Sequence, residues 1–242
     1  MVGTWINVAG ILIGALMGVV WKQNLAPGTQ MFIKTLLGAL LLFSGLRLGW
    51  VGLTSGGTFV SLLKQLALVF VALALGKWVG RLMRLQKTSN RLGQFARRKM
   101  ESASPSNPNR FSDGFFVCAL LFCAAPLGSV GALTDGLDGF WLPLAIKGVM
   151  DGLGAVSFAA MFGVGVLFSS VPVLVFQGSI TLVAARWLLP WLESRGVADP
   201  LHTTAGFLVI CISLLVFEMR RIEVTDYLPA LVLAPLFAWW LG

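Results

Sequence analysis

The chain has 242 residues, of which 57% are apolar and only 12% are charged, and its mean hydropathy is +0.86. A soluble domain is roughly 45–50% apolar and about 25% charged, so these values exclude a soluble globule and indicate that lipid surrounds most of the chain. The net charge of +8 does not indicate nucleic-acid binding, because half of the 18 Lys and Arg residues lie in one loop.

Apolar runs dominate the chain from its first residues to its last. A transmembrane helix needs about 20 mostly apolar residues, and Gly, Pro and Ser residues separate runs of this kind here. The predicted spans are residues 3–21, 31–50, 59–80, 114–133, 141–168, 171–191, 203–219 and 227–241. We therefore expect an all-α membrane protein, a bundle of about eight transmembrane helices. The weakest boundary is Ser169–Pro172, which is short for a loop between two full spans.

A basic loop follows the third span. Its nine cationic residues are Lys77, Arg81, Arg84, Lys87, Arg91, Arg97, Arg98, Lys99 and Arg110. Basic segments beside apolar spans normally stay cytoplasmic and attract anionic lipid headgroups. We therefore expect residues 77–110 to face the cytoplasm and contact such headgroups, with both chain termini outside. Apolar residues recur within the loop at near-helical spacing, which predicts either an amphipathic helix on the membrane surface or an extension of the third span.

This loop divides the chain into three segments: an N-terminal three-helix segment (1–80), the basic loop (81–112) and a C-terminal five-helix segment (113–242). A shift of 168 residues relates parts of the two helical segments. It pairs Gly10 with Gly178, Thr35 with Thr203, Gly38 with Gly206 and Leu40 with Leu208. Because the first span would correspond to the sixth, the two copies would point in opposite directions, as in the inverted repeats of many transporters.

Lys147 and Asp151 break the apolar pattern of the fifth span. They are four residues apart, so on a helix they share one face and can pair. Counted from Trp141 at the expected interface, Asp151 lies roughly 15 Å deep at helical rise. A charge near the midplane costs at least ~2.5–3.5 kcal/mol and needs a partner or water. The pair therefore either serves binding or proton transfer, or neutralises itself as a structural contact.

The fourth and fifth spans also contain helix-breaking residues. Pro126 interrupts the fourth span, and the fifth span contains four glycines: Gly152, Gly154, Gly163 and Gly165. Adjacent interrupted spans are a sequence feature of transporter binding sites. The alternative is close helix packing through small residues.

Neutral polar residues and one further carboxylate could complete a site. The candidates besides Asp151 and Lys147 are Asn7, Asp135, Ser170, Gln177 and Thr181. The single histidine, His202, excludes a multi-histidine metal site, and Asp135 with Asp138 offers too few carboxylates for a calcium loop. No nucleotide-binding or hydrolase motif is present. We therefore expect no cofactor, no metal and no catalytic residue.

Several of these residues form an ordered set of motifs. They are Gly3-Thr4-x-x-Asn7, Asp135-Gly136-Leu137, Lys147 with Asp151-Gly152, Gly163-x-Gly165-Val166, Ser169-Ser170, Gln177-Gly178 and Leu228-Pro229-Ala230-Leu231. Over essentially its whole length the chain resembles the YqgA/YdfK-like bacterial inner-membrane proteins, domain-of-unknown-function family 554. It departs from that pattern at Asp226, where Asn is usual, and at Ala124–Leu127. The resemblance implies a bacterial inner-membrane location and no defined activity.

Three functions remain open at this level. The leading hypothesis is a small secondary transporter or ion-translocating protein that binds a small solute or ion, with Asp151 as its charged switch and Lys147 as the counter-ion. A membrane scaffold or sensor would use the basic loop as its partner surface. An intramembrane enzyme would need Asp135 and Asp151 to converge. The composition also allows a homo-oligomer.

Overall fold

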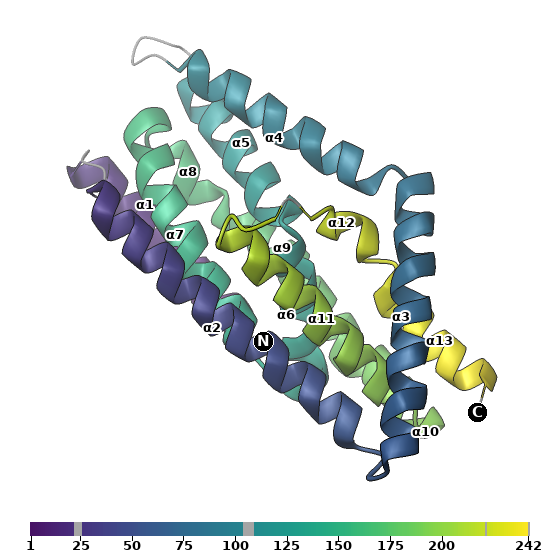
Figure 1. The fold of residues 1–242 in the computed structure, drawn as a ribbon. Coiled ribbons are helices and arrows are strands. Elements are labelled where there is room, and N and C mark those ends of the chain that lie inside the picture. The colour runs from purple at the N-terminus through teal and green to yellow at the C-terminus, as the bar shows by residue number, and fades with distance from the viewer. Residues whose placement is uncertain (22–25, 104–108, 221, 242) are drawn as a thin grey trace. The chain divides into compact units, whose positions relative to one another are not determined.

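The computed structural model describes residues 1–21, 26–103, 109–220 and 222–241 (Figure 1), and all regular structure in these residues is helical. The first helices are α1 (Val2–Trp21), α2 (Pro27–Thr54), α3 (Phe59–Leu82), α4 (Leu85–Glu101), α5 (Arg110–Ala124), α6 (Pro126–Asp138) and α7 (Leu142–Phe162). They are followed by α8 (Gly165–Phe168), α9 (Ser170–Val183), the π-helical turn η1 (Ala184–Leu188), α10 (Leu189–Arg195), α11 (Ala198–Val216), α12 (Val224–Tyr227) and α13 (Ala230–Leu241).

Seven helical segments of the described chain are long and apolar enough to cross a membrane. They are α1, Gly28–Thr54, α3, α7, Gly165–Arg195, α11 and Val224–Leu241. Helices α5 and α6 pass the same test together and make an eighth crossing if they count as one bent span. The predicted all-α membrane bundle with about eight spans is therefore confirmed.

The fourth span is interrupted at Ala125, as the sequence predicted. Ala125 has extended backbone angles, and α6 begins at Pro126, so α5 and α6 are bent by 59° relative to each other. Proline has no N–H to donate and restricts the residue before it to extended conformations. The bend therefore follows directly from Pro126.

The break after α7 comes earlier than expected. The predicted boundary at Ser169–Pro172 is only a kink, with α9 beginning at Ser170, whereas α7 itself ends at Phe162. The cause is Gly163, whose φ of 76° and ψ of −149° lie in a region that only glycine adopts readily.

The basic loop forms a helix of its own, distinct from α3. Helix α3 ends at Leu82, and Arg84 adopts a left-handed φ of 57° before α4 begins at Leu85. Ala96 of α4 is buried in an apolar cluster with Val117 of α5 and Phe162 of α7. This part of the apolar face of α4 therefore packs against protein, and not against lipid as a purely interfacial helix would. The interpretation of this segment as an extension of α3 is therefore wrong, and the helix on the membrane surface stays a prediction, with Ala96 as one contact to protein.

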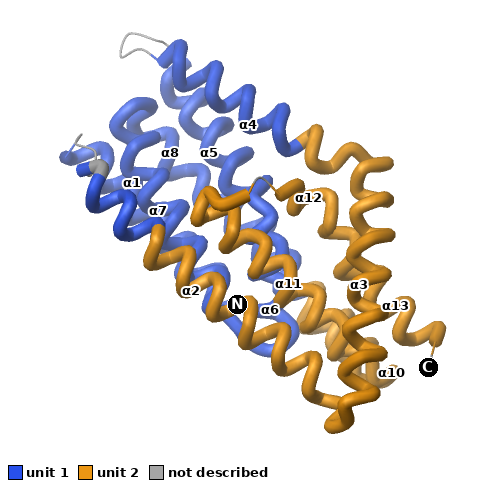
Figure 2. Tube along the Cα trace, viewed as in Figure 1, with its two compact units in different colours: residues 1–34, 89–182 blue, residues 35–88, 183–242 orange. Residues whose placement is uncertain are grey.

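The described residues group into two compact units, coloured separately in Figure 2. Unit 1 comprises residues 1–34 and 89–182, and unit 2 comprises residues 35–88 and 183–242. Each unit is discontinuous in sequence and combines helices from both ends of the chain. The two units therefore do not coincide with the three sequence segments 1–80, 81–112 and 113–242. That threefold division remains an interpretation of the sequence.

In unit 1, α1 and α7 pack closely and run in the same direction. A Cβ added to Gly10 would overlap the carbonyl oxygen of Gly148, and one added to Gly14 would overlap that of Gly152. The same offset in residue number relates both pairs, so the helices are parallel. Glycines permit this approach because no side chain separates the two backbones.

The parallel direction of α1 and α7 bears on the bent α5–α6 pair. If α2, α3 and the bent pair each cross the bilayer once, α7 must run in the same direction as α1. A pair that returned to its starting side would reverse α7. The packing inside unit 1 therefore supports a single bent crossing and a total of eight.

In unit 2, helices that are distant in sequence pack antiparallel. Gly45 of α2 lies against Ile210 of α11, and Gly52 lies against Thr203, so residue numbers fall on one helix as they rise on the other. Helix α3 makes an antiparallel contact with the last segment of the chain, since Gly76 approaches Ala230 and Gly80 approaches Asp226.

Candidate functional site

Two buried amide side chains meet in unit 1. The Nδ2 atom of Asn7 on α1 donates to the Oε1 atom of Gln177 on α9 at 3.0 Å, and neither residue has any exposed surface. Nearby, the hydroxyls of Thr4 and Thr181 lie 3.4 Å apart, and Thr181 donates to the carbonyl of Ala132 on α6 at 3.1 Å. These bonds join α1, α9 and α6 by polar contacts in a region that is otherwise apolar.

Lys147 and Asp151 lie beside the amides and are bonded to each other. The Lys147 ammonium donates to the Oδ2 atom of Asp151, and only 2% and 9% of the two residues are exposed. The side chain of Asn7 also interacts with the Asp151 carboxylate. Lys147 lies 6.0 Å from the ring centre of Phe122, in the last turn of α5. We name Asn7, Gln177, Lys147 and Asp151 the polar cluster.

The break between α5 and α6 adjoins this cluster. A Cβ placed on Gly128, the third residue of α6, would lie 3.0 Å from Cε of Lys147 and 3.2 Å from Nε2 of Gln177. The absence of a side chain at Gly128 therefore lets both polar groups approach the first turn of α6. A helix N-terminus presents unpaired N–H groups and a positive dipole end, so the cluster has both a charged pair and a polar backbone next to it.

Two atoms of the cluster have no hydrogen-bond partner among the described residues. They are the Oδ1 acceptor of Asn7 and the Nε2 donor of Gln177. Exchanging the O and N atoms of Asn7 would place an oxygen against the Asp151 carboxylate, so its orientation is fixed by its neighbours. An unsatisfied buried polar group costs about 1–3 kcal/mol. The amides are therefore suited to a small species that both accepts and donates a hydrogen bond.

Asp135 is held at the start of α1, apart from the cluster. Its Oδ2 atom accepts from the backbone N–H of Gly3 at 3.1 Å and lies 3.2 Å from the Met1 amino group. Asp135 and Asp151 thus have different partners, one near the end of α6 and the other near the middle of α7. The arrangement lacks the shared contact that two cooperating carboxylates would make.

The structure brings most of the predicted site residues together. Asn7, Gln177, Lys147 and Asp151 form the cluster, and Thr181 lies one turn from Gln177 on α9. Ser170 is separate: its hydroxyl donates to the carbonyl of Leu167 at 2.7 Å, about 10 Å along α9 from Gln177.

Sequence reasoning missed Gly128 and Phe122 as neighbours of Lys147. The only local signal for them was the proline that breaks the span between the two positions. Their closeness to Lys147 depends on the 59° bend at that proline, which brings the end of α5 and the start of α6 to the same side chain.

The whole chain matches proteins of undefined activity. Residues 2–239 match the family described as "Protein of unknown function (DUF554)". The chain is 27% identical over 243 residues to "Uncharacterized protein YqgA" of Escherichia coli (strain K12), covering 99% of this chain and 97% of that protein. It is 24% identical over 235 residues to "Uncharacterized membrane protein YdfK" of Bacillus subtilis (strain 168), covering 97% and 94%. No solved structure gave a significant match.

Proposed function

We propose that this chain, which belongs to the DUF554 family of proteins of unknown function, is a small secondary transporter or ion-translocating protein with its site at the polar cluster. The observation that carries the proposal is a buried charge pair beside two buried amides that each keep one unpaired atom. Asp151 is the ninth residue after Leu142, roughly 13.5 Å along α7. A carboxylate at that depth is a candidate for function by default.

The ion that fits this site best is the proton. A metal cation at Asp151 would meet the Lys147 ammonium, which already occupies one carboxylate oxygen. The described residues hold no group of three His, Cys, Asp or Glu side chains that could bind a metal. A proton needs no ligand shell, because it binds the carboxylate itself. Its arrival would neutralise Asp151 and release Lys147 from the pair.

Helix packing inside the units supports an inverted repeat. The 168-residue shift relates α1 to α9, α2 to α11, and α3 to the α13 region. In each case the related helices pack antiparallel, as in the contacts Asn7–Gln177, Gly45–Ile210 and Gly76–Ala230. The contacts Asn7–Gln177 and Gly45–Ile210 lie within three residues of the positions that the shift itself pairs, as expected near an axis in the membrane plane, whereas Ala230 is the first residue of α13. The amide pair would then lie near that axis.

We assign the chain to the bacterial inner membrane with its basic loop in the cytoplasm and both termini outside. The assignment follows from the concentration of Lys and Arg at residues 77–110 and from an even number of crossings. On α4, Lys87, Arg91 and Arg98 are exposed and lie on the face opposite Ala96 at helical spacing. These three cations are the groups through which anionic headgroups would be attracted.

The scaffold and the intramembrane enzyme are weaker alternatives. A scaffold would use the same exposed cations of α4, but a scaffold role does not explain the presence of the buried polar cluster. An enzyme would need Asp135 and Asp151 to act on one substrate, and their separate partners disfavour this. We therefore propose a function without catalysis, in which a small solute or ion is the cargo.

Proton flux tests the proposal. Purified protein in vesicles containing a pH-sensitive dye should move protons when a valinomycin-clamped potassium potential is applied. Asp151→Asn should reduce that flux at least ten-fold, because the amide cannot take up a proton. Glu193→Gln, at an exposed carboxyl of α10, is the matched control and should leave flux intact. Equal flux in wild type, the Asp151 variant and empty vesicles would refute proton translocation through this site.

A further inference from the structure

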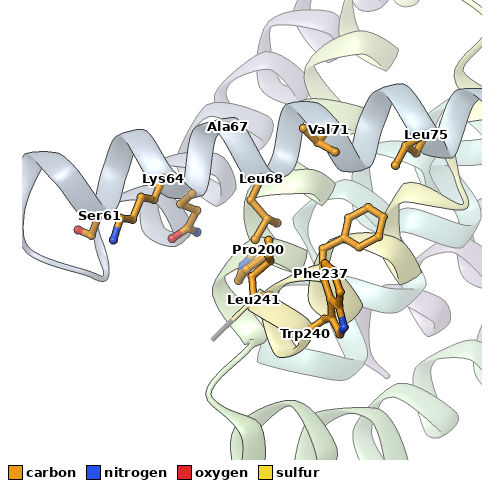
Figure 3. A pocket seen from close by; sticks show the side chains of 12 residues that line it. Ser61, Lys64, Ala67, Leu68, Val71, Leu75, Pro200, Phe237, Trp240 and Leu241 are labelled. Carbon is orange, nitrogen blue, oxygen red and sulfur yellow. The ribbon is translucent and has the colours of Figure 1, made fainter.

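Unit 2 carries an open groove of about 770 Å³ between α3 and α13 (Figure 3). Helices α3 and α13 approach each other at Gly76 and Ala230, and the groove lies along the earlier part of α3. Its apolar walls are Ala67, Leu68, Val71, Leu75, Pro200, Phe237, Ala238, Trp240 and Leu241. The groove is formed by different residues from the polar cluster, which lies in unit 1.

The chemistry of the groove is divided along its length. One end is polar, with Ser61, Lys64 and Gln65, whereas the remainder is apolar. Gln65 is engaged within the protein, since its Nε2 atom donates to the carbonyl of Gly52 at 2.7 Å and to the hydroxyl of Thr203 at 2.9 Å. Lys64 makes no ion pair with the described residues, and no carboxylate lines the groove. The polar end therefore offers one cation.

The dimensions of the groove match one leaflet of a bilayer. Lys64 and Leu75 are separated by about 16.5 Å along α3 at helical rise, compared with about 15 Å for half of the hydrocarbon layer. Lys64 is five residues from the start of α3, roughly 7.5 Å into the helix. A lysine at that depth can extend its ammonium to the headgroup level while its alkyl chain stays among apolar atoms.

We propose that this groove binds one membrane lipid with an anionic headgroup, its phosphate at Lys64 and an acyl chain along α3 between Leu68 and Leu75. Charge complementarity favours an anionic lipid, because a single cation at the end of an apolar channel matches an amphiphile with a single anionic end. A zwitterionic lipid would leave the charge of Lys64 uncompensated, because the cation of its own headgroup offsets its phosphate. Trp240, beside the channel, is 81% exposed and available to cover the chain.

Native mass spectrometry of the full-length protein in mild detergent tests the proposal. The probes are phosphatidylglycerol and phosphatidylcholine of identical acyl chains, added separately at equal concentrations. Wild type should retain one phosphatidylglycerol roughly five-fold more strongly than phosphatidylcholine, the effect of about one favourable cation near a phosphate. Lys64→Gln should abolish this preference. Arg186→Gln removes one positive charge from an exposed position of η1 outside the groove and should leave the preference unchanged.

A second pair of variants tests the apolar part of the groove. Ala67→Trp should fill the channel and reduce retention of both lipids at least ten-fold. Leu63→Trp, at an exposed position of α3 outside the groove, should have no effect. The proposal would be overturned if phosphatidylglycerol retention were unchanged in both Lys64→Gln and Ala67→Trp. So would a protein dimer that Ala67→Trp dissociates while no lipid is retained.

Discussion

At the scale of single residues, the main question is what a charged pair inside an apolar bundle contributes. Lys147 and Asp151 neutralise each other, but Asn7 also interacts with the carboxylate and Phe122 lies near the ammonium. Removing two charges from water costs more than a single contact returns, unless further hydrogen bonds surround them. The Asn7 side chain from α1 and the Phe122 ring from α5 therefore help to stabilise the buried pair.

Stability measurements on a double-mutant cycle should reveal this dependence. Lys147→Met alone leaves Asp151 as an unpaired buried charge and should destabilise the protein by about 3–5 kcal/mol. The double variant Lys147→Met/Asp151→Asn removes both charges and should recover much of that loss. The measurement is the free energy of unfolding in detergent, or the melting temperature where unfolding is irreversible. A double variant less stable than Lys147→Met would contradict the buried pair.

At the scale of helices, close packing depends on glycine at specific positions. Gly14 of α1 faces the backbone of Gly152 on α7, and Gly10 faces Gly148 in the same manner. Many other glycines of the chain do not have this role. Gly93 of α4, for example, has open space where a Cβ would be added. The parallel α1–α7 contact also fixes the height of Asn7 relative to Asp151.

Alanine at these two kinds of glycine should have opposite effects. Replacing glycine by alanine inside a helix is intrinsically favourable by about 1 kcal/mol, so Gly93→Ala should be neutral or stabilising. Gly14→Ala adds a methyl group where a carbonyl oxygen already lies, and overpacking costs about 1–3 kcal/mol. We expect a lower melting temperature for Gly14→Ala in detergent. If both variants melt like wild type, the α1–α7 packing described above is wrong.

At the scale of the whole molecule, the number of crossings decides which side each loop faces. Apolar length alone allows seven or eight spans. The parallel α1–α7 pair favours eight, with α5 and α6 crossing once as a bent span. In that arrangement the ends of the α5–α6 pair lie on opposite sides of the membrane.

Cysteine labelling in inside-out and right-side-out vesicles tests this topology. The background variant lacks Cys118, Cys123 and Cys211, all of which are free thiols. A membrane-impermeant maleimide should label Ser112→Cys and Arg91→Cys from the cytoplasmic side, and Asp138→Cys only from the opposite side. Labelling of Ser112→Cys and Asp138→Cys from one common side would mean that α5 and α6 form a re-entrant pair.

The sequence by itself determined the features that depend on neighbouring residues. Apolar length predicted the spans, because hydrocarbon leaves a chain few alternatives to a helix with satisfied backbone bonds. Pro126 predicted the break in the fourth span, since its effect is local. The spacing of Lys147 and Asp151 predicted their contact, because residues four apart are adjacent on any helix.

Only the tertiary structure decided the contacts between distant segments. Nothing local in Asn7 and Gln177 indicates that these residues, 170 positions apart, share a hydrogen bond. Hydropathy also could not tell that Ala96 of α4 packs against protein, because apolar contact with lipid and with protein has the same sequence pattern. Helices inserted in a bilayer are equally apolar on many faces, so their pairing is decided by small residues, buried polar groups and shape.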